Sequence, residues 1–134
     1  MPGCLIDSSV ILDVFSDDPV WGSRSLMAIA SAAEKGMIAI NPIIYAEISI
    51  RFSRIEDLED AITDAGFQLL PIPREALFLA GKAFLSYRRA GGTKASPLPD
   101  FFIGAHSAVS GLPLLTRDPE RVRTHFPRVR IIEV

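Results

Sequence analysis

Five short apolar segments alternate with helical segments along this chain, and this alternation limits the fold more than any other feature of the sequence. Each apolar segment is long enough for a strand but too short for a buried helix. Parallel strands need long crossover connections, which the intervening helices supply. The sequence therefore predicts an α/β fold of three layers, with helices on both faces of a short, mostly parallel central sheet of about five strands. The expected strands are 4–6, 37–40, 67–70, 112–116 and 129–134.

Helix start and stop signals fill the spaces between these strands. Asp18-Pro19 and Asn41-Pro42 each place a capping residue before a proline, as at the start of many helices. Gly36 and Gly111 follow helical segments and are expected to end them. The expected helices are 10–15, 18–36, 41–53, 56–64, 74–90 and 97–111, with a brief helix from Pro119.

The length and composition indicate one domain that spans residues 1–134. A chain of 134 residues with 49% hydrophobic residues is enough for one sizeable core. No apolar run approaches the roughly 20 residues that a membrane helix needs, and the first residues lack the basic start of a secretory signal. We therefore expect a cytoplasmic protein without a membrane segment. The single cysteine, Cys4, allows neither a disulfide nor a thiolate metal site within one chain.

Charge is distributed unevenly along the chain, although the net charge is only -2. Residues 1–80 hold 5 Lys and Arg against 12 Asp and Glu, whereas residues 81–134 hold 9 against 4. The second part therefore carries +5 and the first -7. A polyanion such as RNA could lie along the second part, but ordinary solvated surface charge explains the same pattern equally well.

Four carboxylate residues map to the sheet edge where the carboxyl ends of the strands lie. Asp7 follows the first expected strand and Asp118 follows the fourth. Asp100 lies in the first turn of the helix before that fourth strand, so a short antiparallel connection places it beside Asp118. Glu47 lies in the second turn of the helix that begins at Asn41. Parallel sheets bind ligands at this edge, which we therefore interpret as the candidate site.

Each of the four acids also has a purely structural alternative. Asp7 and Asp118 stand where helix N-caps are expected, and Asp100 in a first turn complements the helix dipole. Glu47 lies on an apolar face of its helix, and Arg51, one turn further on, is its alternative partner.

Four carboxylates at one edge would repel one another and raise their own pKa values unless a cation lies among them. Oxygen donors without His or Cys favour Mg²⁺ or Mn²⁺ over zinc. Ser9 and Thr116, each two residues from an edge Asp, could support the carboxylates or a metal-bound water by hydrogen bonds. They could equally be ordinary turn residues. His106 lies within an apolar helix and is expected to be packed or surface-exposed, not a base.

Four segments together resemble the PIN-domain ribonucleases, most closely the VapC-type toxins of bacterial and archaeal toxin-antitoxin pairs. The segments are LIDSSVILD at 5–13, NPIIYAEI at 41–48, LPDFFIGAHSA at 98–108 and LLTRD at 114–118, and they follow one another in the family's order and spacing. The resemblance implies that Asp7, Glu47, Asp100 and Asp118 form the family's acidic quartet, which is catalytic and holds the metal. It also implies that Thr116 and Ser9 are supporting residues, although many relatives carry Asn in place of Ser9.

The resemblance further implies hydrolysis of RNA phosphodiester bonds by a water that one or two Mg²⁺ or Mn²⁺ ions activate. Glu47 would be a metal ligand or the acceptor of the water's proton. Candidates for contacts with the RNA backbone are Arg88, Lys94 and Arg117, with Lys82 and Arg89 as further basic residues. As implied partners we expect a small cognate antitoxin protein and a second copy of the chain in a homodimer, and the toxin would inhibit translation and growth.

Two other function classes remain as alternatives. A receiver-like signalling domain also binds Mg²⁺ in an acidic pocket, but its pattern has paired acids after the first strand, and here two serines follow Asp7. A phosphatase with an Asp-x-Asp nucleophile is disfavoured because Ser9 stands at the second position. A catalytically inactive PIN-fold binding module is the remaining alternative, which only an assay distinguishes.

Overall fold

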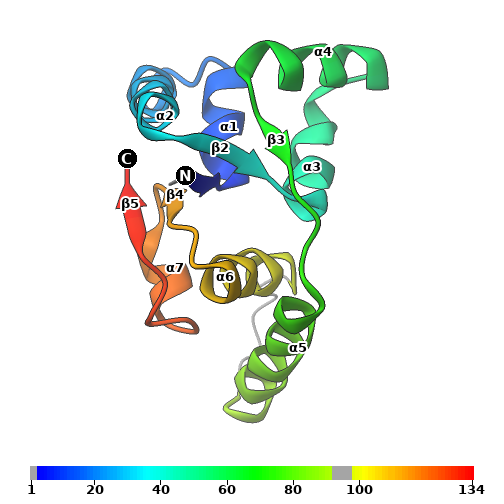
Figure 1. Cartoon of the computed structure of the whole chain (residues 1–134), viewed down its shortest axis with the longest axis vertical. Helices are drawn as coiled ribbons and strands as arrows, with labels where there is room; N and C mark the ends of the chain where they lie inside the picture. Colours follow the sequence, from blue (N-terminus) through cyan, green and yellow to red (C-terminus); the bar gives the residue numbers. More distant parts are fainter. Residues whose placement is uncertain (1–2, 92–97) are drawn as a thin grey trace.

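The central feature of the structure is a twisted sheet of five strands, all of which pair in parallel (Figure 1). The computed structural model describes residues 3–91 and 98–134. The strands are β1 (Gly3–Ile6), β2 (Met37–Ile40), β3 (Gln68–Leu69), β4 (Leu114–Thr116) and β5 (Ile131–Glu133), in the order β3-β2-β1-β4-β5. The parallel sheet that the alternation predicted is therefore confirmed.

Helices cover both faces of this sheet, as the three-layer prediction required. Figure 1 shows α1 (Ser8–Phe15), α2 (Gly22–Lys35) and α4 (Ile55–Ala65) on one side of the sheet. On the other side lie α5 (Arg74–Arg89), α6 (Leu98–Ser110) and α7 (Pro119–Arg123). Helix α3 (Pro42–Ile48) contacts both α1 and α6 and so links the two helical layers. None of the described helices is both long and apolar enough to cross a membrane.

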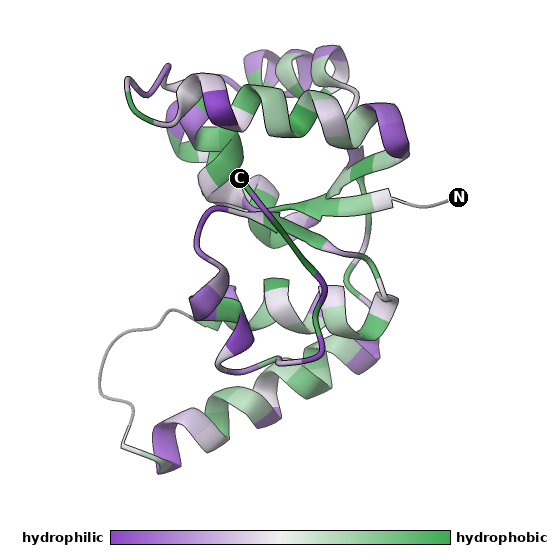
Figure 2. Cartoon of the chain, turned by 90° about the vertical axis from the view of Figure 1, so that its left-hand side faces the viewer, coloured by the Kyte–Doolittle hydropathy of each residue, from purple (hydrophilic) through white to green (hydrophobic). Residues whose placement is uncertain are grey.

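The core lies where the two central strands meet the helices. Leu5 and Ile6 of β1 are fully buried, as are Leu114 and Leu115 of β4. The register places Leu5 opposite Leu114 and Ile6 opposite Leu115. Figure 2 shows the apolar colouring concentrated in the sheet and on the helix faces that line it. Because both faces of these strands are covered, they consist almost entirely of apolar residues.

Three of the expected helix boundaries were wrong by two residues or more, the first because α1 begins at Ser8 and not at Val10. Helix α2 begins at Gly22, not at residue 18, because the Asp18 carboxylate accepts hydrogen bonds from the backbone N–H groups of Val20 and Trp21. That arrangement forms a turn before the helix. The helix expected at 41–53 ends at Ile48 and continues as a 3₁₀ helix, η1 (Ser49–Arg51).

Candidate active site

The four predicted acids lie at the carboxyl ends of the central strands. Asp7 directly follows β1, Asp118 lies two residues past β4, Asp100 is in the first turn of α6, and Glu47 is in α3. The charges of Asp7 and Asp100 both act on Glu47, and those of Asp7 and Asp118 act on Asp100. The structure therefore brings all four carboxylates into one electrostatic site.

Thr116 connects two of these acids by hydrogen bonds. Asp7 is only 8% exposed, and its Oδ2 accepts a bond from Thr116 Oγ1 at 2.8 Å and another from Ser9 Oγ at 3.2 Å. The Thr116 hydroxyl oxygen also accepts a bond from the backbone N–H of Asp118 at 3.1 Å. Both residues that the sequence suggested as supports, Ser9 and Thr116, therefore hold the Asp7 carboxylate in place.

The capping alternative fails for both aspartates that stand at N-cap positions. Asp7 precedes α1 and Asp118 precedes α7, yet neither side chain caps its helix within the described part of the chain. The Asp7 carboxylate accepts from the hydroxyls of Thr116 and Ser9 and not from the backbone N–H groups at the start of α1. Both carboxylates are therefore directed away from the role that local sequence alone would assign to them.

Glu47 is bound by Ser8, a residue that the sequence analysis did not select. Ser8 is buried, and its hydroxyl donates to Glu47 Oε1 at 2.8 Å across 39 positions of sequence. No ion pair joins Glu47 to Arg51 in the described ranges, so the structural alternative for this acid is wrong. Burial raises the pKa of Glu47, and the charges of Asp7 and Asp100 raise it further, against the opposing effect of the Ser8 hydrogen bond.

Arg121 lies between the carboxylates of Asp100 and Asp118. Its Nη1 is 3.1 Å from Asp100 Oδ2, and its Nε is 3.2 Å from Asp118 Oδ2. The combined charges of Asp100, Asp7 and Asp118 raise the pKa of Arg121 and outweigh its burial, which acts in the opposite direction. Sequence reasoning missed this residue, although its spacing of three from Asp118 on an expected helix is a pairing signal.

The positive charge of Arg121 does not offset the combined effect of burial and negative charge on Asp100. Burial is the main cause of the raised pKa of Asp100, and Asp7 and Asp118 add to it although Arg121 acts to lower it. A carboxyl group whose pKa stays raised although a guanidinium lies beside it can accept a further cation.

The donor atoms suit a hard divalent cation, because carboxylate and hydroxyl oxygens are the ligands of Mg²⁺ and Mn²⁺. Across residues 3–91 and 98–134, no three His, Cys, Asp or Glu side chains lie close enough together to hold a metal as they stand. The chemistry of the site therefore fits the ion, but its side chains have to move to bind it.

The basic residues suggested for substrate contacts lie in different settings. Arg117 pairs with buried Asp13, with Nε 3.1 Å from Oδ2, and its guanidinium stacks 5.1 Å from the centre of the Trp21 ring. Arg88 is exposed on α5 and lies 5.8 Å from the centre of the Phe84 ring. Lys94 lies outside the described residues. Of the two residues that the structure describes, Arg88 is the freer to reach a ligand.

His106 is packed, as the sequence analysis expected. It is 1% exposed, and its Nδ1 lies 3.0 Å from Asn41 Nδ2, so the ring nitrogen accepts from the amide. Asn41 also caps α3 by accepting from the Ile44 N–H at 2.9 Å. Burial lowers the pKa of His106. The histidine therefore joins α6 to the start of α3 in its neutral form.

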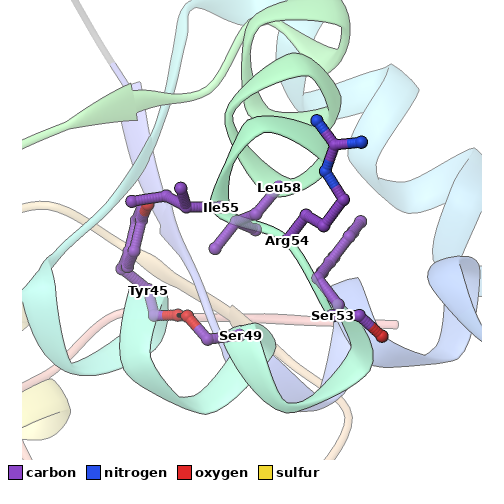
Figure 3. Close-up of a pocket in the computed structure, with 7 residues that line it drawn as sticks. Tyr45, Ser49, Ser53, Arg54, Ile55 and Leu58 are labelled. Carbon is purple, nitrogen blue, oxygen red and sulfur yellow. Dashed lines mark hydrogen bonds between the residues drawn. The ribbon is translucent and has the colours of Figure 1, made fainter.

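A separate pocket of about 190 Å³ lies beside α3, η1 and α4 (Figure 3). It is lined by Tyr45, Ser49, Phe52, Ser53, Arg54, Ile55 and Leu58. None of the four acids lines it, and Tyr45 directs its hydroxyl to Glu59 at 2.6 Å. The pocket is therefore distinct from the acidic site.

The model of the PIN domain family matches residues 4–129, which is nearly the whole chain and includes all four acids. The chain belongs to the PIN domain family. No curated protein sequence matches it. Family membership excludes the receiver-like signalling domain and leaves the inactive PIN module as the alternative to an enzyme.

Solved structures with the same PIN fold are similar over almost their full lengths. VapBC2 from Rickettsia felis, bound to a promoter DNA fragment, has a TM-score of 0.72 and 14% identity, and the match covers 96% of each chain. FitAcB from Neisseria gonorrhoeae has a TM-score of 0.71 and 20% identity and covers 97% of this chain and 96% of that one. DNA-bound VapBC from Salmonella typhimurium has a TM-score of 0.71 and 16% identity, with 99% and 98% covered. At these identities the likeness concerns the fold.

Proposed function

We propose that this PIN domain is a metal-dependent ribonuclease and the toxin of a toxin-antitoxin pair. The observation that carries the proposal is the acidic site itself, in which Thr116 ties Asp7 to Asp118 while Asp100 and Glu47 complete the quartet. A structural role does not require four carboxylates at the ligand-binding edge of a parallel sheet, because they repel one another there.

The four acids divide into two tasks in the proposed reaction, metal binding and proton transfer. Asp7, oriented by Thr116 and Ser9, and the flanking Asp100 and Asp118 hold one or two Mg²⁺ or Mn²⁺ ions. A bound ion of this kind lowers the pKa of a water molecule and offsets negative charge at phosphorus. Glu47 accepts the proton of the attacking water, and its raised pKa brings it closer to the working pH of a general base. Ser8 keeps the Glu47 carboxylate directed into the site.

The substrate class follows from charge and family. Residues 81–134 carry an excess of five positive charges, from 9 Lys and Arg against 4 Asp and Glu. Cations of this kind bind the phosphates of RNA regardless of its sequence. Arg88, which is exposed on α5, is a candidate for this role, with Lys94 and Arg117 as further candidates.

The partners are proposed from the structural relatives. Solved neighbours include VapBC from Salmonella typhimurium and a toxin-antitoxin complex from Klebsiella pneumoniae, the latter with a TM-score of 0.61 and 18% identity. We infer that a small antitoxin protein binds and inhibits this chain, and that the chain forms a homodimer. Co-expression with the product of the adjacent gene tests this pairing, and a free, uninhibited protein would count against it.

The central experiment is incubation of the purified chain with total RNA, with Mg²⁺ or Mn²⁺ and with EDTA. We expect a discrete cleavage product that needs the divalent cation and disappears with Asp7→Asn. Asp57→Asn on the exposed side of α4 is the matched control and should cleave like the wild type. Equal cleavage by Asp7→Asn and wild type, or no cleavage by either, would leave the inactive binding module as the better description.

A further inference from the structure

We propose that Arg121 is an internal competitor for the metal. Its guanidinium occupies the side of the site formed by Asp100 and Asp118 and must leave before a divalent cation can use these carboxylates. This inference rests on the proposed function, because it concerns the metal of the same site. Arg121 is then a positioning residue, because it determines the concentration of divalent cation at which Asp100 and Asp118 bind the metal.

The contacts of Arg121 extend beyond a local helix pair. The pair with Asp118 joins the residue that precedes α7 to one three positions further on, a spacing at which surface pairs are common. The bond to Asp100, however, reaches 21 residues back to another helix, α6. One guanidinium thus bridges two of the proposed metal ligands through different nitrogen atoms.

Little space remains beside Asp7 and Asp100 when Arg121 is in place. The opening beside the acids is lined by Asp7, Asp100, Ile103, Leu114, Arg121 and Val122 and has a volume of about 10 Å³. This is about the space that a single water molecule needs. Magnesium keeps an octahedral shell and usually several waters, which do not fit into such an opening. A hydrated Mg²⁺ therefore cannot enter this opening beside Asp7 and Asp100 while the Arg121 guanidinium lines it.

The Arg121 side chain can move away from Asp100 and Asp118 toward solvent. Its side chain is 40% exposed, and its partner Asp118 is 52% exposed, whereas Asp100 is 18% exposed. Ion pairs between partly exposed groups are weak because water screens them and the long side chains lose freedom. The neighbouring Arg123 pairs with Glu120 and does not contact the four acids among its described interactions. Departure of Arg121 toward solvent therefore leaves Asp100 and Asp118 free for the metal.

The test is calorimetric titration of Mn²⁺ into the purified full chain, without RNA. We compare wild type with Arg121→Gln, Arg121→Lys and the neighbouring control Arg123→Gln, and circular dichroism and thermal melting check that each variant folds. We expect Arg121→Gln to bind Mn²⁺ about tenfold more tightly than wild type, which corresponds to about 1.4 kcal/mol. Arg121→Lys keeps the charge but lacks the planar fork whose separate nitrogens contact Asp100 and Asp118, so its affinity should lie between the two. Arg123→Gln should match wild type.

The outcomes separate this inference from the proposed function. Unchanged or weaker Mn²⁺ binding by folded Arg121→Gln, with a wild type that binds Mn²⁺ and cleaves RNA, overturns the competition and leaves the ribonuclease standing. If Arg123→Gln tightens Mn²⁺ binding as much as Arg121→Gln does, charge acts at a distance and occupation of the site is refuted. If neither wild type nor Arg121→Gln binds Mn²⁺, the metal-dependent mechanism fails, and the inference fails with it. If Arg121→Gln does not fold, the lysine variant alone decides.

Discussion

Replacement of Glu47 by Gln should stabilise this protein while it abolishes cleavage. The substitution removes one negative charge but keeps the side-chain oxygen that accepts the bond from Ser8 at 2.8 Å. Burial, with the charges of Asp7 and Asp100, raises the pKa of Glu47 in the fold. Relative to the unfolded chain, the folded protein therefore disfavours the charged form of this side chain.

The expected gain in the free energy of unfolding can be estimated from comparable substitutions. Removal of an unfavourable functional charge commonly adds about 0.5–2 kcal/mol to the free energy of unfolding. For a chain of 134 residues, an unfolding entropy of about 2.1 cal/mol/K per residue converts this into a rise in Tm of about 2–7 °C. Thermal and urea denaturation in EDTA measure it, with Glu34→Gln on the exposed side of α2 as a control expected within about 0.5 kcal/mol of wild type.

The pH dependence provides the sharper check. A carboxyl whose folded pKa is raised contributes stability below its unfolded pKa and loses it as pH rises through the folded pKa. The advantage of Glu47→Gln over wild type should therefore be absent near pH 4 and appear as the pH rises, because wild-type Glu47 ionises only then. A variant less stable than wild type at pH 7, or a gain that persists unchanged at pH 4, would refute the electrostatic reasoning.

Three further predictions concern the structure around the site. Thr116→Val removes the hydroxyl bond to a buried carboxylate and should lower the free energy of unfolding by about 1.5–3 kcal/mol in urea, whereas Thr116→Ser should retain most of it. Because burial lowers the pKa of His106, its contribution to stability is present above about pH 6.5 and is lost as pH falls, so melting curves from pH 7 to 5 should decline less steeply for His106→Gln. Gly104→Ala would place a methyl group against the Phe126 ring and should cost about 1–3 kcal/mol, while Gly81→Ala in open space on α5 should gain up to about 1 kcal/mol; equal effects in thermal melting would contradict the packing described.

Local sequence patterns were sufficient for the fold class and for the sheet edge at which the acids lie. Apolar strands and helix signals depend on neighbouring residues, so the alternation predicted the parallel sheet that the structure contains. In a parallel sheet the carboxyl ends of the strands meet at one edge. That rule alone placed Asp7 and Asp118 together, and the short connection from α6 to β4 added Asp100.

Only the tertiary structure decided which groups hold these acids. Ser8 contacts Glu47 across 39 positions of sequence, Arg121 contacts Asp100 across 21, and Arg117 pairs with Asp13. Such contacts depend on how helices from different parts of the chain are packed, and no local pattern records that packing. Capping was the local expectation for Asp7 and Asp118, and it failed because the Asp7 carboxylate accepts from side-chain hydroxyls and the Asp118 carboxylate pairs with Arg121 instead of backbone N–H groups.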